Sequence, residues 1–440
     1  MRVLQVLHNH PPEFRGGVER YVEEVCAGLM ARGHRVTVLC GSERSAERTQ
    51  VEEETWRGVP VMRLVRRAGL RHPLDPFDPE CVNPLHEILD RVRPDVLHVH
   101  HWWNLSDDLV RRSAARGHPT VVTLHDAFST CALFFRLDGS GAPCDRPQSG
   151  ETCGPCVGGR FGLDVAEVRW LAELRRDTFA AELRAAGHVL TPSRAHARVL
   201  EPHVPQDVDL HPLPLGAPLF DEIPPRPDPR PGRLRLIHFG NLSRLKGVEI
   251  LARAVEEADP GGNAISLDLF GDVIEEGLDL GRARMHGSYT RDELPRLAAG
   301  ADLAVFPSLA RESYGIVVDE ALRLGLPVLV SEIGALAERI GKRGVAFRAG
   351  DVTALAELLR SFLRDPERLR SLLEAAEHEL PTPEVHAAEL EAIYCKVRRM
   401  PLPPVDLETP LLRRISRFRE RMGEVISILS GSSDGEEGRR

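Results

Sequence analysis

Short apolar runs alternate with helical segments along most of this chain, and this alternation constrains the fold more than any other feature. The run 3–7 ends in a polar loop, apolar residues recur at helical spacing over 18–31, and a second apolar run follows at 35–40. Further runs at 96–100 and 121–126 extend the pattern. Repeated strand, helix, strand units build parallel sheets. The sequence therefore predicts an α/β fold with a doubly wound sheet, whose ligands lie at the carboxyl ends of its strands.

A proline-rich stretch divides the chain into two parts. Eight prolines lie between positions 210 and 232, a density that excludes helices and central strands. Apolar runs then resume, which predicts a second Rossmann-like domain facing the first across a central cleft. The expected parts are an N-terminal domain over 1–212, a linker over 213–232, a C-terminal domain over 233–382, a helix over 383–400 that returns toward the N-terminal domain, and an appendage over 401–440.

Composition narrows the classes of protein further. Of 440 residues, 42% are hydrophobic and 28% are charged, which are ordinary values for globular domains. The net charge of -9 argues against nucleic acid as a partner. The first apolar run is too short for a secretory leader and no run reaches membrane-spanning length, so a cytoplasmic protein is expected. Among 57 basic residues only three are lysines, which draws attention to each of them.

The strongest motif follows the apolar run 303–306. There Glu312, Gly315 and Glu320 surround the start of a predicted helix. A helix N-terminus presents free backbone N–H groups to an anion such as a diphosphate, and glycine lets the backbone approach that anion closely. Two carboxylates at this spacing can address two parts of one extended ligand, for example a sugar and a ribose diol. The alternative is one carboxylate favoured by the helix dipole and another that is solvated.

A second motif lies at 239–247, where a strand ends in glycines before a predicted helix. Lys246 is a compact point charge suited to phosphate oxygens, and Arg244 offers a planar fork of donors. The alternative is that each is an ordinary solvated loop residue. The scarcity of lysine in this chain favours a phosphate site at Lys246.

Together, the segment Gly16-Gly17-Val18-Glu19, the run 121–126 and the Glu312-x7-Glu320 motif resemble the retaining glycosyltransferases of family 4, which have the GT-B fold. The resemblance implies transfer of a sugar, with retention, from a nucleotide-sugar to a glycan or lipid-linked acceptor in polysaccharide or glycoconjugate biosynthesis. It implies no cofactor for catalysis. The alternatives are a nucleotide-sugar 2-epimerase of the same fold and a non-catalytic nucleotide-sugar-binding module.

The resemblance also implies roles for individual residues. Glu312 contacts the donor sugar, Glu320 the ribose hydroxyls and Lys246 the leaving phosphate. The implied catalytic residues are His125, Glu312 and Lys246, and the implied donor-binding residues are Gly16, Gly17, Asn241, Arg244, Lys246, Ser313, Tyr314, Gly315, Ile316 and Glu320. One position departs from the family, which often has arginine where this chain has Asn241. Either Arg244 supplies the missing cation or the site depends on Lys246 alone.

Four of the eight cysteines fall within the segment 127–160, which is predicted to be a loop at the acceptor mouth. They are Cys131, Cys144, Cys153 and Cys156. This spacing favours a structural zinc site, with a disulfide, free thiols or a redox pair as alternatives. The last pair is not expected to open a helix. The other cysteines, Cys26, Cys40, Cys81 and Cys395, are expected to be buried as small hydrophobic residues.

The histidines near the first sheet allow two interpretations. His98, His100 and His101 suggest a metal cluster, but burial of His98 inside the strand and a place at the cleft for His100 or His101 is the favoured interpretation. His125, followed by Asp126, allows a structural hydrogen-bonded pair as the alternative to a role at the sugar.

The appendage contains an amphipathic pattern over 410–429, with arginines interleaved among apolar residues. A basic amphipathic helix of this kind binds anionic membranes, so peripheral contact with the inner face of the membrane is one expectation. Docking onto the protein's own surface or onto a second subunit is the other. The last ten residues are serine, glycine or charged and are expected to be disordered. The oligomeric state is left open.

Overall fold

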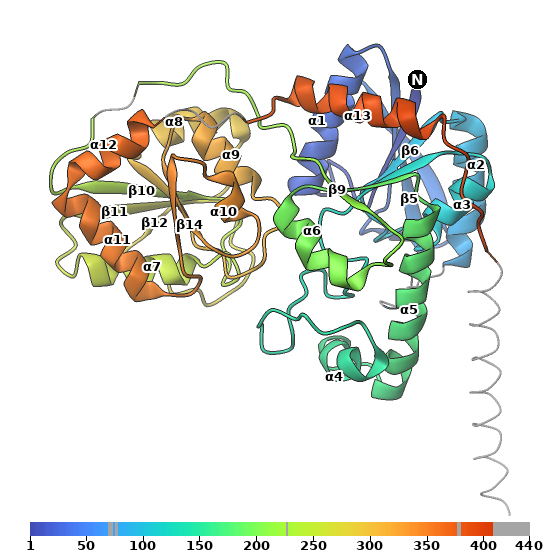
Figure 1. Ribbon diagram of the computed structural model, residues 1–440, viewed down its shortest axis with the longest axis horizontal. Coiled ribbons are helices and arrows are strands. Elements are labelled where there is room, and N and C mark those ends of the chain that lie inside the picture. The colour runs from blue at the N-terminus through green and yellow to red at the C-terminus, as the bar shows by residue number, and fades with distance from the viewer. Residues whose placement is uncertain (69–73, 75–77, 226–227, 376–379, 408–440) are drawn as a thin grey trace, which may run out of the picture.

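The computed structural model describes residues 1–68, 74, 78–225, 228–375 and 380–407, and these form two α/β units joined side by side (Figure 1). The predicted fold class, two Rossmann-like domains facing a cleft, is confirmed. The amphipathic segment 410–429 lies outside the described residues. Within the described part, every helix is too short or too polar to cross a lipid bilayer.

The N-terminal unit is built on a nine-stranded sheet in the order β3-β5-β2-β1-β6-β7-β8-β9, with β4 paired to β5. Only the β4–β5 pair is antiparallel among the strands described. The strands are β1 (Arg2–Leu7), β2 (Arg35–Cys40), β3 (Ser45–Ala46), β4 (Gln50–Trp56), β5 (Val59–Arg67), β6 (Val96–Val99), β7 (Thr120–Thr123), β8 (His188–Thr191) and β9 (Leu210–Pro212). The helices are α1 (Gly17–Ala31), α2 (Val82–Val92), α3 (Leu109–Ala115), α4 (Gly150–Phe161), α5 (Val165–Ala185) and α6 (Arg194–Leu200).

The C-terminal unit has a parallel six-stranded sheet in the order β12-β11-β10-β13-β14-β15. Its strands are β10 (Leu234–Phe239), β11 (Ile265–Phe270), β12 (Arg284–Met285), β13 (Leu303–Phe306), β14 (Val328–Ser331) and β15 (Gly344–Phe347). Its helices are α7 (Val248–Ala258), α8 (Leu294–Ala299), α9 (Ile316–Arg323), α10 (Leu336–Arg339), α11 (Val352–Arg364) and α12 (Pro366–Glu374), and α13 (Pro383–Val397) follows. The order of strands reverses between β10 and β13, and such a reversal opens a crevice at the carboxyl ends of the strands.

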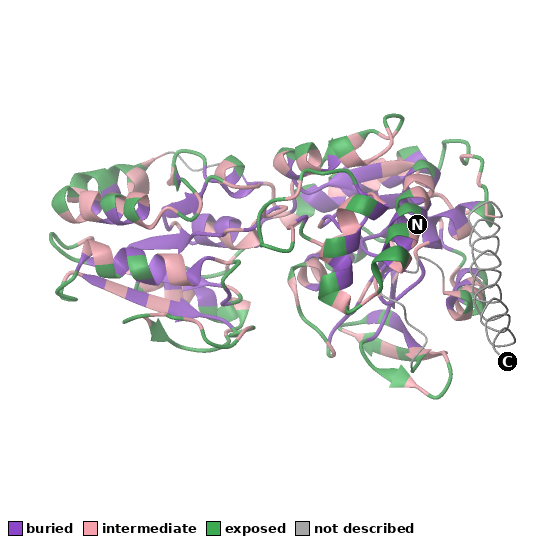
Figure 2. Cartoon of the chain, turned by 90° about the horizontal axis from the view of Figure 1, so that it is seen from below, coloured by how far each residue is buried: buried purple, intermediate pink, exposed green. Residues whose placement is uncertain are grey.

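Both sheets are covered on two faces by helices, and the burial pattern explains why their strands are continuous apolar runs. Every residue of β6, β7, β13 and β14 is buried, and the buried strands lie between helices whose outer faces are exposed (Figure 2). A parallel strand covered on both faces has no solvent side, so polar residues do not alternate along it. The runs found in the sequence at 303–306 and 121–126 reflect this burial.

The chain crosses between the units twice, and the two crossings run side by side. After β9 the proline-rich stretch contains no helix or strand among its described residues until β10 begins at Leu234. The amide of Ala217 in this stretch donates to the carbonyl of Pro381, 2.7 Å away, just before α13. Helix α13 then lies on the N-terminal unit beside α1 (Figure 1). A side chain at Gly28 of α1 would lie 2.7 Å from Cβ of Ala387, so glycine permits this close packing.

Buried polar contacts anchor α13 on the N-terminal unit. The hydroxyl of Tyr394 lies 2.7 Å from Nδ1 of His98, and the side-chain amide of Gln5 donates to it over 3.4 Å. Near the start of the helix, Nε2 of His386 is 2.8 Å from the hydroxyl of Tyr21. All of these side chains are buried, so each lost partner leaves a polar atom without solvent.

Two predictions about the cysteines are wrong. The segment 127–160 is not a loop throughout, because α4 occupies its last part and contains both Cys153 and Cys156. Ser149 caps this helix by accepting from the amide of Thr152. Cys395 is half-buried rather than buried, whereas the other three cysteines outside the segment are buried as expected.

Replacing Tyr394 with phenylalanine is expected to lower stability by about 1–3 kcal/mol, because the change leaves Nδ1 of His98 and the amide of Gln5 buried without a partner. The measurement is the thermal unfolding midpoint by calorimetry. Tyr289→Phe is the matched control, since the Tyr289 ring lies at the edge of a cavity. Equal midpoints for wild type and Tyr394→Phe would contradict the importance of this anchor.

Candidate functional site

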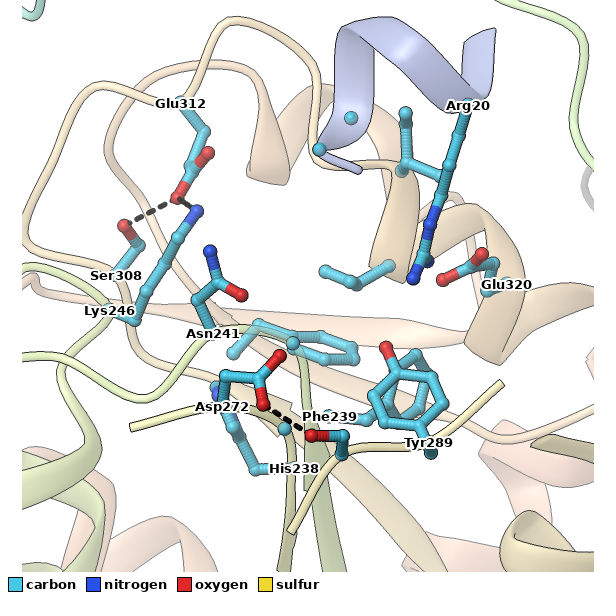
Figure 3. A pocket seen from close by; sticks show the side chains of 18 of the residues that line it. Arg20, His238, Phe239, Asn241, Lys246, Asp272, Tyr289, Ser308, Glu312 and Glu320 are labelled. Carbon is cyan, nitrogen blue, oxygen red and sulfur yellow. Dashed lines mark hydrogen bonds and ion pairs between the residues drawn. The ribbon is translucent and has the colours of Figure 1, made fainter. Parts of the chain in front are cut away.

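A cavity of about 200 Å³ lies where the start of α1 meets the carboxyl ends of the C-terminal strands (Figure 3). The N-terminal unit lines it with Arg15, Gly16, Gly17 and Arg20. The C-terminal unit lines it with His238, Phe239, Gly240, Asn241, Lys246, Gly271, Asp272, Ser288, Tyr289, Phe306, Ser308, Glu312, Ile316, Val317, Glu320 and Leu336. The cavity therefore occupies the crevice that the strand order predicts, and both units contribute to it.

Two helices begin at this cavity, one from each unit. Gly315 is the N-cap of α9 and has a φ of 87°, and a side chain there would come within 2.3 Å of Leu336. Glycine is thus required both by the backbone conformation and by packing. Gly16 caps α1, and a Cβ added at Gly17 would lie 3.8 Å from Cδ1 of Ile316. The positive ends of two helices consequently face one cavity, an arrangement suited to an anion.

One end of the cavity holds an ion pair between Lys246 and Glu312. Nζ of Lys246 lies 2.6 Å from Oε1 of Glu312, and the hydroxyl of Ser308 donates to the same oxygen over 2.9 Å (Figure 3). Burial by itself raises the pKa of Glu312, but the Lys246 ammonium and the Ser308 hydroxyl outweigh it and hold the pKa below its ordinary value. Glu312 is therefore a carboxylate at neutral pH, with its second oxygen available to a ligand hydroxyl.

The other end of the cavity holds Glu320, which is 1% exposed. Arg291 donates from Nε to Oε1 of Glu320 over 3.1 Å and also pairs with Glu24 of α1. Arg20 points toward Glu320 from the same helix α1 (Figure 3). Burial raises the pKa of Glu320, an effect that Arg291 and Arg20 oppose. The interdomain bridge from Glu24 through Arg291 to Glu320 thus closes this end.

A second cavity of about 560 Å³ adjoins this end. It shares Arg15, Arg20, Asp272 and Tyr289 with the first cavity and continues along α1 toward Trp56. The space between the units therefore continues beyond the first cavity along α1.

Several predicted donor-binding residues lie elsewhere than on the cavity wall. Arg244 is turned outward, where it pairs with Glu249 and Glu275. It therefore does not supply the cation that the family often has at the position of Asn241. Asn241 itself lines the cavity between Lys246 and Asp272 (Figure 3). Lys246 is the one lysine or arginine that the described residues of the C-terminal unit contribute to the lining of this cavity.

Ser313 and Tyr314 join the two units instead of lining the cavity. The hydroxyl of Ser193, at the start of α6, donates to the carbonyl of Ser313 over 2.7 Å. The hydroxyl of Tyr314 lies 2.9 Å from the carbonyl of Leu215 in the linker and 2.7 Å from Oδ2 of Asp319 in α9. The carbonyl of Ser313 and the side chain of Tyr314 thus hold the loop before α9 against the N-terminal unit, while the neighbouring Ile316 lines the cavity.

His125 lies at the carboxyl end of β7, in a chain of buried polar side chains. Nε2 of His125 is 3.0 Å from Nδ1 of His100, whose Nε2 is 2.7 Å from Oε1 of Gln5. Because the Gln5 oxygen only accepts, His100 donates to it from Nε2 and accepts from His125 at Nδ1. Burial lowers the pKa of His125 to about 3, so the ring is neutral. His98, His100 and His101 are buried as well, and no group of histidines, cysteines or carboxylates within the described ranges is arranged around a metal.

Sequence reasoning missed several residues of the cavity. Arg15 and Arg20 flank the glycine pair, but arginine is so common in this chain that neither was noticeable. His238 is the penultimate residue of β10 and Asp272 follows β11, and these positions at strand ends are a signal that could have been used. Nε2 of His238 is buried without a partner among the described residues.

Comparison with known families agrees with this architecture. The family model of Glycosyltransferase Family 4 matches residues 15–217, and that of Glycosyl transferases group 1 matches residues 233–365. The chain belongs to the group 1 glycosyltransferases. The resemblance noted in the sequence is confirmed. The protein is a glycosyltransferase, and the two segments that the family models match coincide with the two units described above.

Individual relatives extend over most of this glycosyltransferase. The glycogen synthase of Mycobacterium tuberculosis is 26% identical, over 86% of this chain and 90% of its own length. The sucrose-phosphate synthase of Thermosynechococcus elongatus has a similar structure, with a TM-score of 0.63, 19% identity and coverage of 90% and 99% of the two chains. Alr3699/HepE of Anabaena, solved in complex with UDP and glucose, has a TM-score of 0.59 at 16% identity, covering 89% and 99%.

Replacing Arg291 with alanine is expected to loosen the two units of this glycosyltransferase, because the carboxylates of Glu24 and Glu320 lose the cation that lies between them. Small-angle X-ray scattering should show a larger radius of gyration for the variant. Arg296→Ala is the matched control, since Arg296 is exposed and its guanidinium lies 4.0 Å from Glu293 of the same unit. An unchanged scattering profile for Arg291→Ala would show that the bridge does not hold the units together.

Proposed function

We propose that this glycosyltransferase transfers a sugar, with retention of configuration, from a nucleotide-sugar to a hydroxyl of a glycan or lipid-linked acceptor. The observation that carries the proposal is the cavity in which two helix N-termini and the Lys246–Glu312 pair face one another. Positive charge from backbone amides and an ammonium suits a diphosphate leaving group. A carboxylate beside that charge suits the hydroxyls of a sugar.

The ends of the cavity suggest how the donor lies in it. The diphosphate lies at the start of α9, near Lys246, so that the sugar reaches Glu312. The nucleoside extends the other way, where the Glu320 carboxylate accepts from the ribose hydroxyls and Tyr289 offers a ring to the base. Arg291 holds Oε1 of Glu320, so in this arrangement the ribose hydroxyls donate to Oε2.

The chemistry assigned to these groups is electrostatic. As the bond from the anomeric carbon to the phosphate oxygen breaks, negative charge grows on that oxygen and Lys246 with the α9 amides stabilises it. The acceptor hydroxyl attacks the same face, and its proton passes to the departing phosphate. Glu312 orients the sugar in this scheme and does not attack it. His125 is neutral and lies outside the lining of the cavity, so its assignment to the sugar rests on the family resemblance alone.

Lys246→Ala is expected to lower kcat by roughly 10²–10³, while nucleotide affinity falls much less, because the ammonium acts mainly on charge that develops during transfer. The measurement is turnover of radiolabelled UDP-, GDP- and ADP-sugars with an acceptor extract. Lys342→Ala, at an exposed position, is the matched control. Equal kcat for Lys246→Ala and wild type would reject the assigned role, and product formed without any acceptor would indicate the 2-epimerase instead.

Glu320→Gln is expected to weaken binding of the matching nucleoside diphosphate by roughly 10–100-fold, as hydrogen bonds to a charged group contribute about 1.5–3 kcal/mol. The raised pKa of Glu320 adds a pH dependence. Wild-type affinity should decline as the carboxylate gains a proton in acid, whereas the variant should be insensitive. Titration calorimetry from neutral to acid pH measures both effects, with Glu357→Gln on the outer helix α11 as control. Parallel pH profiles for Glu320→Gln and wild type would contradict the assignment.

Asn241→Arg is expected to tighten nucleoside diphosphate binding by roughly tenfold, because it restores a cation beside Lys246 in a cavity wall that otherwise offers an amide. The same calorimetric titration measures the change. Asn263→Arg adds the same charge at an exposed turn and controls for the overall charge of the protein. Weaker binding by Asn241→Arg would place the phosphates away from this loop.

A further inference from the structure

The four cysteines of the segment 127–160 line one small cavity of the N-terminal unit. They come from three pieces of chain: the turn that holds Cys131, the hairpin that ends at Cys144, and helix α4, which carries Cys153 and Cys156. The cavity has a volume of about 30 Å³, enough for a single atom with its contacts. Helix α4, which carries two of these cysteines, projects below the main body of the N-terminal unit (Figure 1).

Two buried arginines flank these thiols. Arg136 is 2% exposed and donates to the backbone carbonyls of Thr130 and Cys144, at 2.9 and 3.0 Å. Arg175 is 1% exposed, stacks on Phe128 at 4.3 Å and has an Nη1 without a partner in the described part of the chain. Neither guanidinium makes an ion pair with any described carboxylate. Charged neighbours still act on both: Asp107 and Asp126 on Arg175, Asp145 on Arg136, and Cys131 and Cys153 on each when they are thiolates.

Burying two cations is costly unless negative charge lies near them, and anionic sulfurs here would add to the charge that Asp107, Asp126 and Asp145 supply. Four neutral thiols add no such charge. Four thiolates around one divalent cation carry a net charge of minus two, which Arg136 and Arg175 would balance. The stacking of Arg175 on an aromatic ring compensates its burial only in part.

Helix α4 has a sequence that does not favour a helix by itself. Four of its twelve residues are glycine and Pro155 lies inside it, and these two residue types have the lowest helix propensity. Three of the glycines permit close packing on α5, as a side chain at Gly150 would lie 2.7 Å from the backbone of Arg169. The cysteines, at i and i+3, lie on a different face. In the described part of the chain, the core around them has five buried hydrophobic residues with five partly buried ones packed against it.

We propose that Cys131, Cys144, Cys153 and Cys156 bind one thiophilic divalent cation of the zinc class, which holds α4 and the hairpin together. Zinc accepts four thiolates in tetrahedral geometry, and structural sites of this kind supply folding energy to small, weakly packed segments. As the side chains now stand, no three described ligand groups are close enough to bind a metal, so binding draws the sulfurs inward across the cavity.

The site has a consequence for the cleft. Asp145 follows Cys144 and receives two hydrogen bonds from Arg311, one of them at 3.0 Å, across the interface between the units. Arg311 immediately precedes Glu312. Fixing the hairpin at Cys144 therefore fixes one support of the loop that carries Glu312. The inference goes beyond the proposed reaction, because metal binding requires nothing of the donor.

The test is metal analysis of the purified full-length protein by inductively coupled plasma mass spectrometry. About one zinc per chain is expected in the wild type, a loss of most of it in Cys153→Ser/Cys156→Ser, and full retention in Cys395→Ser. Exchange of Co²⁺ for zinc should produce a thiolate charge-transfer band together with the absorption of tetrahedral cobalt. These readouts do not involve catalysis, so failure of the proposed function would not alter them.

Several results would overturn the proposal. One is wild-type protein without stoichiometric metal that also fails to give the cobalt spectrum. Another is a Cys–Cys bond among the four residues in the peptide map. Because the double variant can unfold, the wild-type protein is also treated with a chelator. Hydrogen exchange should then rise in the segment 140–156 and not in α11, and unchanged exchange after metal removal would exclude a structural role.

Discussion

The hydroxyl of Tyr314 makes the contact on which the arrangement of the cleft depends. It meets a carbonyl of the interdomain linker and the carboxylate of Asp319 in the first turn of α9, and it has one proton for these two acceptors. Arg339 pairs with the same carboxylate at 2.6 and 3.1 Å and stacks on the Tyr314 ring at 4.3 Å. The linker is thereby held at the start of α9, which is also where the cavity begins. Burial makes this contact expensive to lose, because each group left behind has no water.

The polarity of the cavity follows from that geometry. With the start of α9 next to the linker, the start of α1 comes to face it, and two helix dipoles add their positive ends to the charge of Lys246. The carboxylates stand at the two extremes, Glu312 paired to Lys246 and Glu320 paired to Arg291. This order of charges along the cavity matches an extended ligand that has an anionic centre and hydroxyl groups at both ends.

The sequence was sufficient for the features that depend on local pattern. Buried strands appear as apolar runs, and Gly315 was identified because it lies at a predicted helix start, where the structure has a left-handed backbone. The sequence did not predict which way individual side chains point. Arg244 turns outward because Glu249 and Glu275 attract it, and those partners come together only in the folded loop. Likewise, four glycines and a proline concealed α4, which forms because it packs closely on α5.

Both units take part in building the loop that carries Glu312. Ser193 donates to the carbonyl of Ser313, and the carboxylate of Glu338 accepts from the first two amides of α6, at 2.9 and 2.8 Å. The cysteine hairpin supports the same loop through Arg311. Within the C-terminal unit the amide of Ala335 also donates to the carbonyl of Glu312 over 2.9 Å. Because the loop has supports in both units, a change in the angle between the units would load its N-terminal supports and leave this one in place. The position of Glu312 relative to Lys246 therefore depends on the contacts across the cleft as well as on the C-terminal unit.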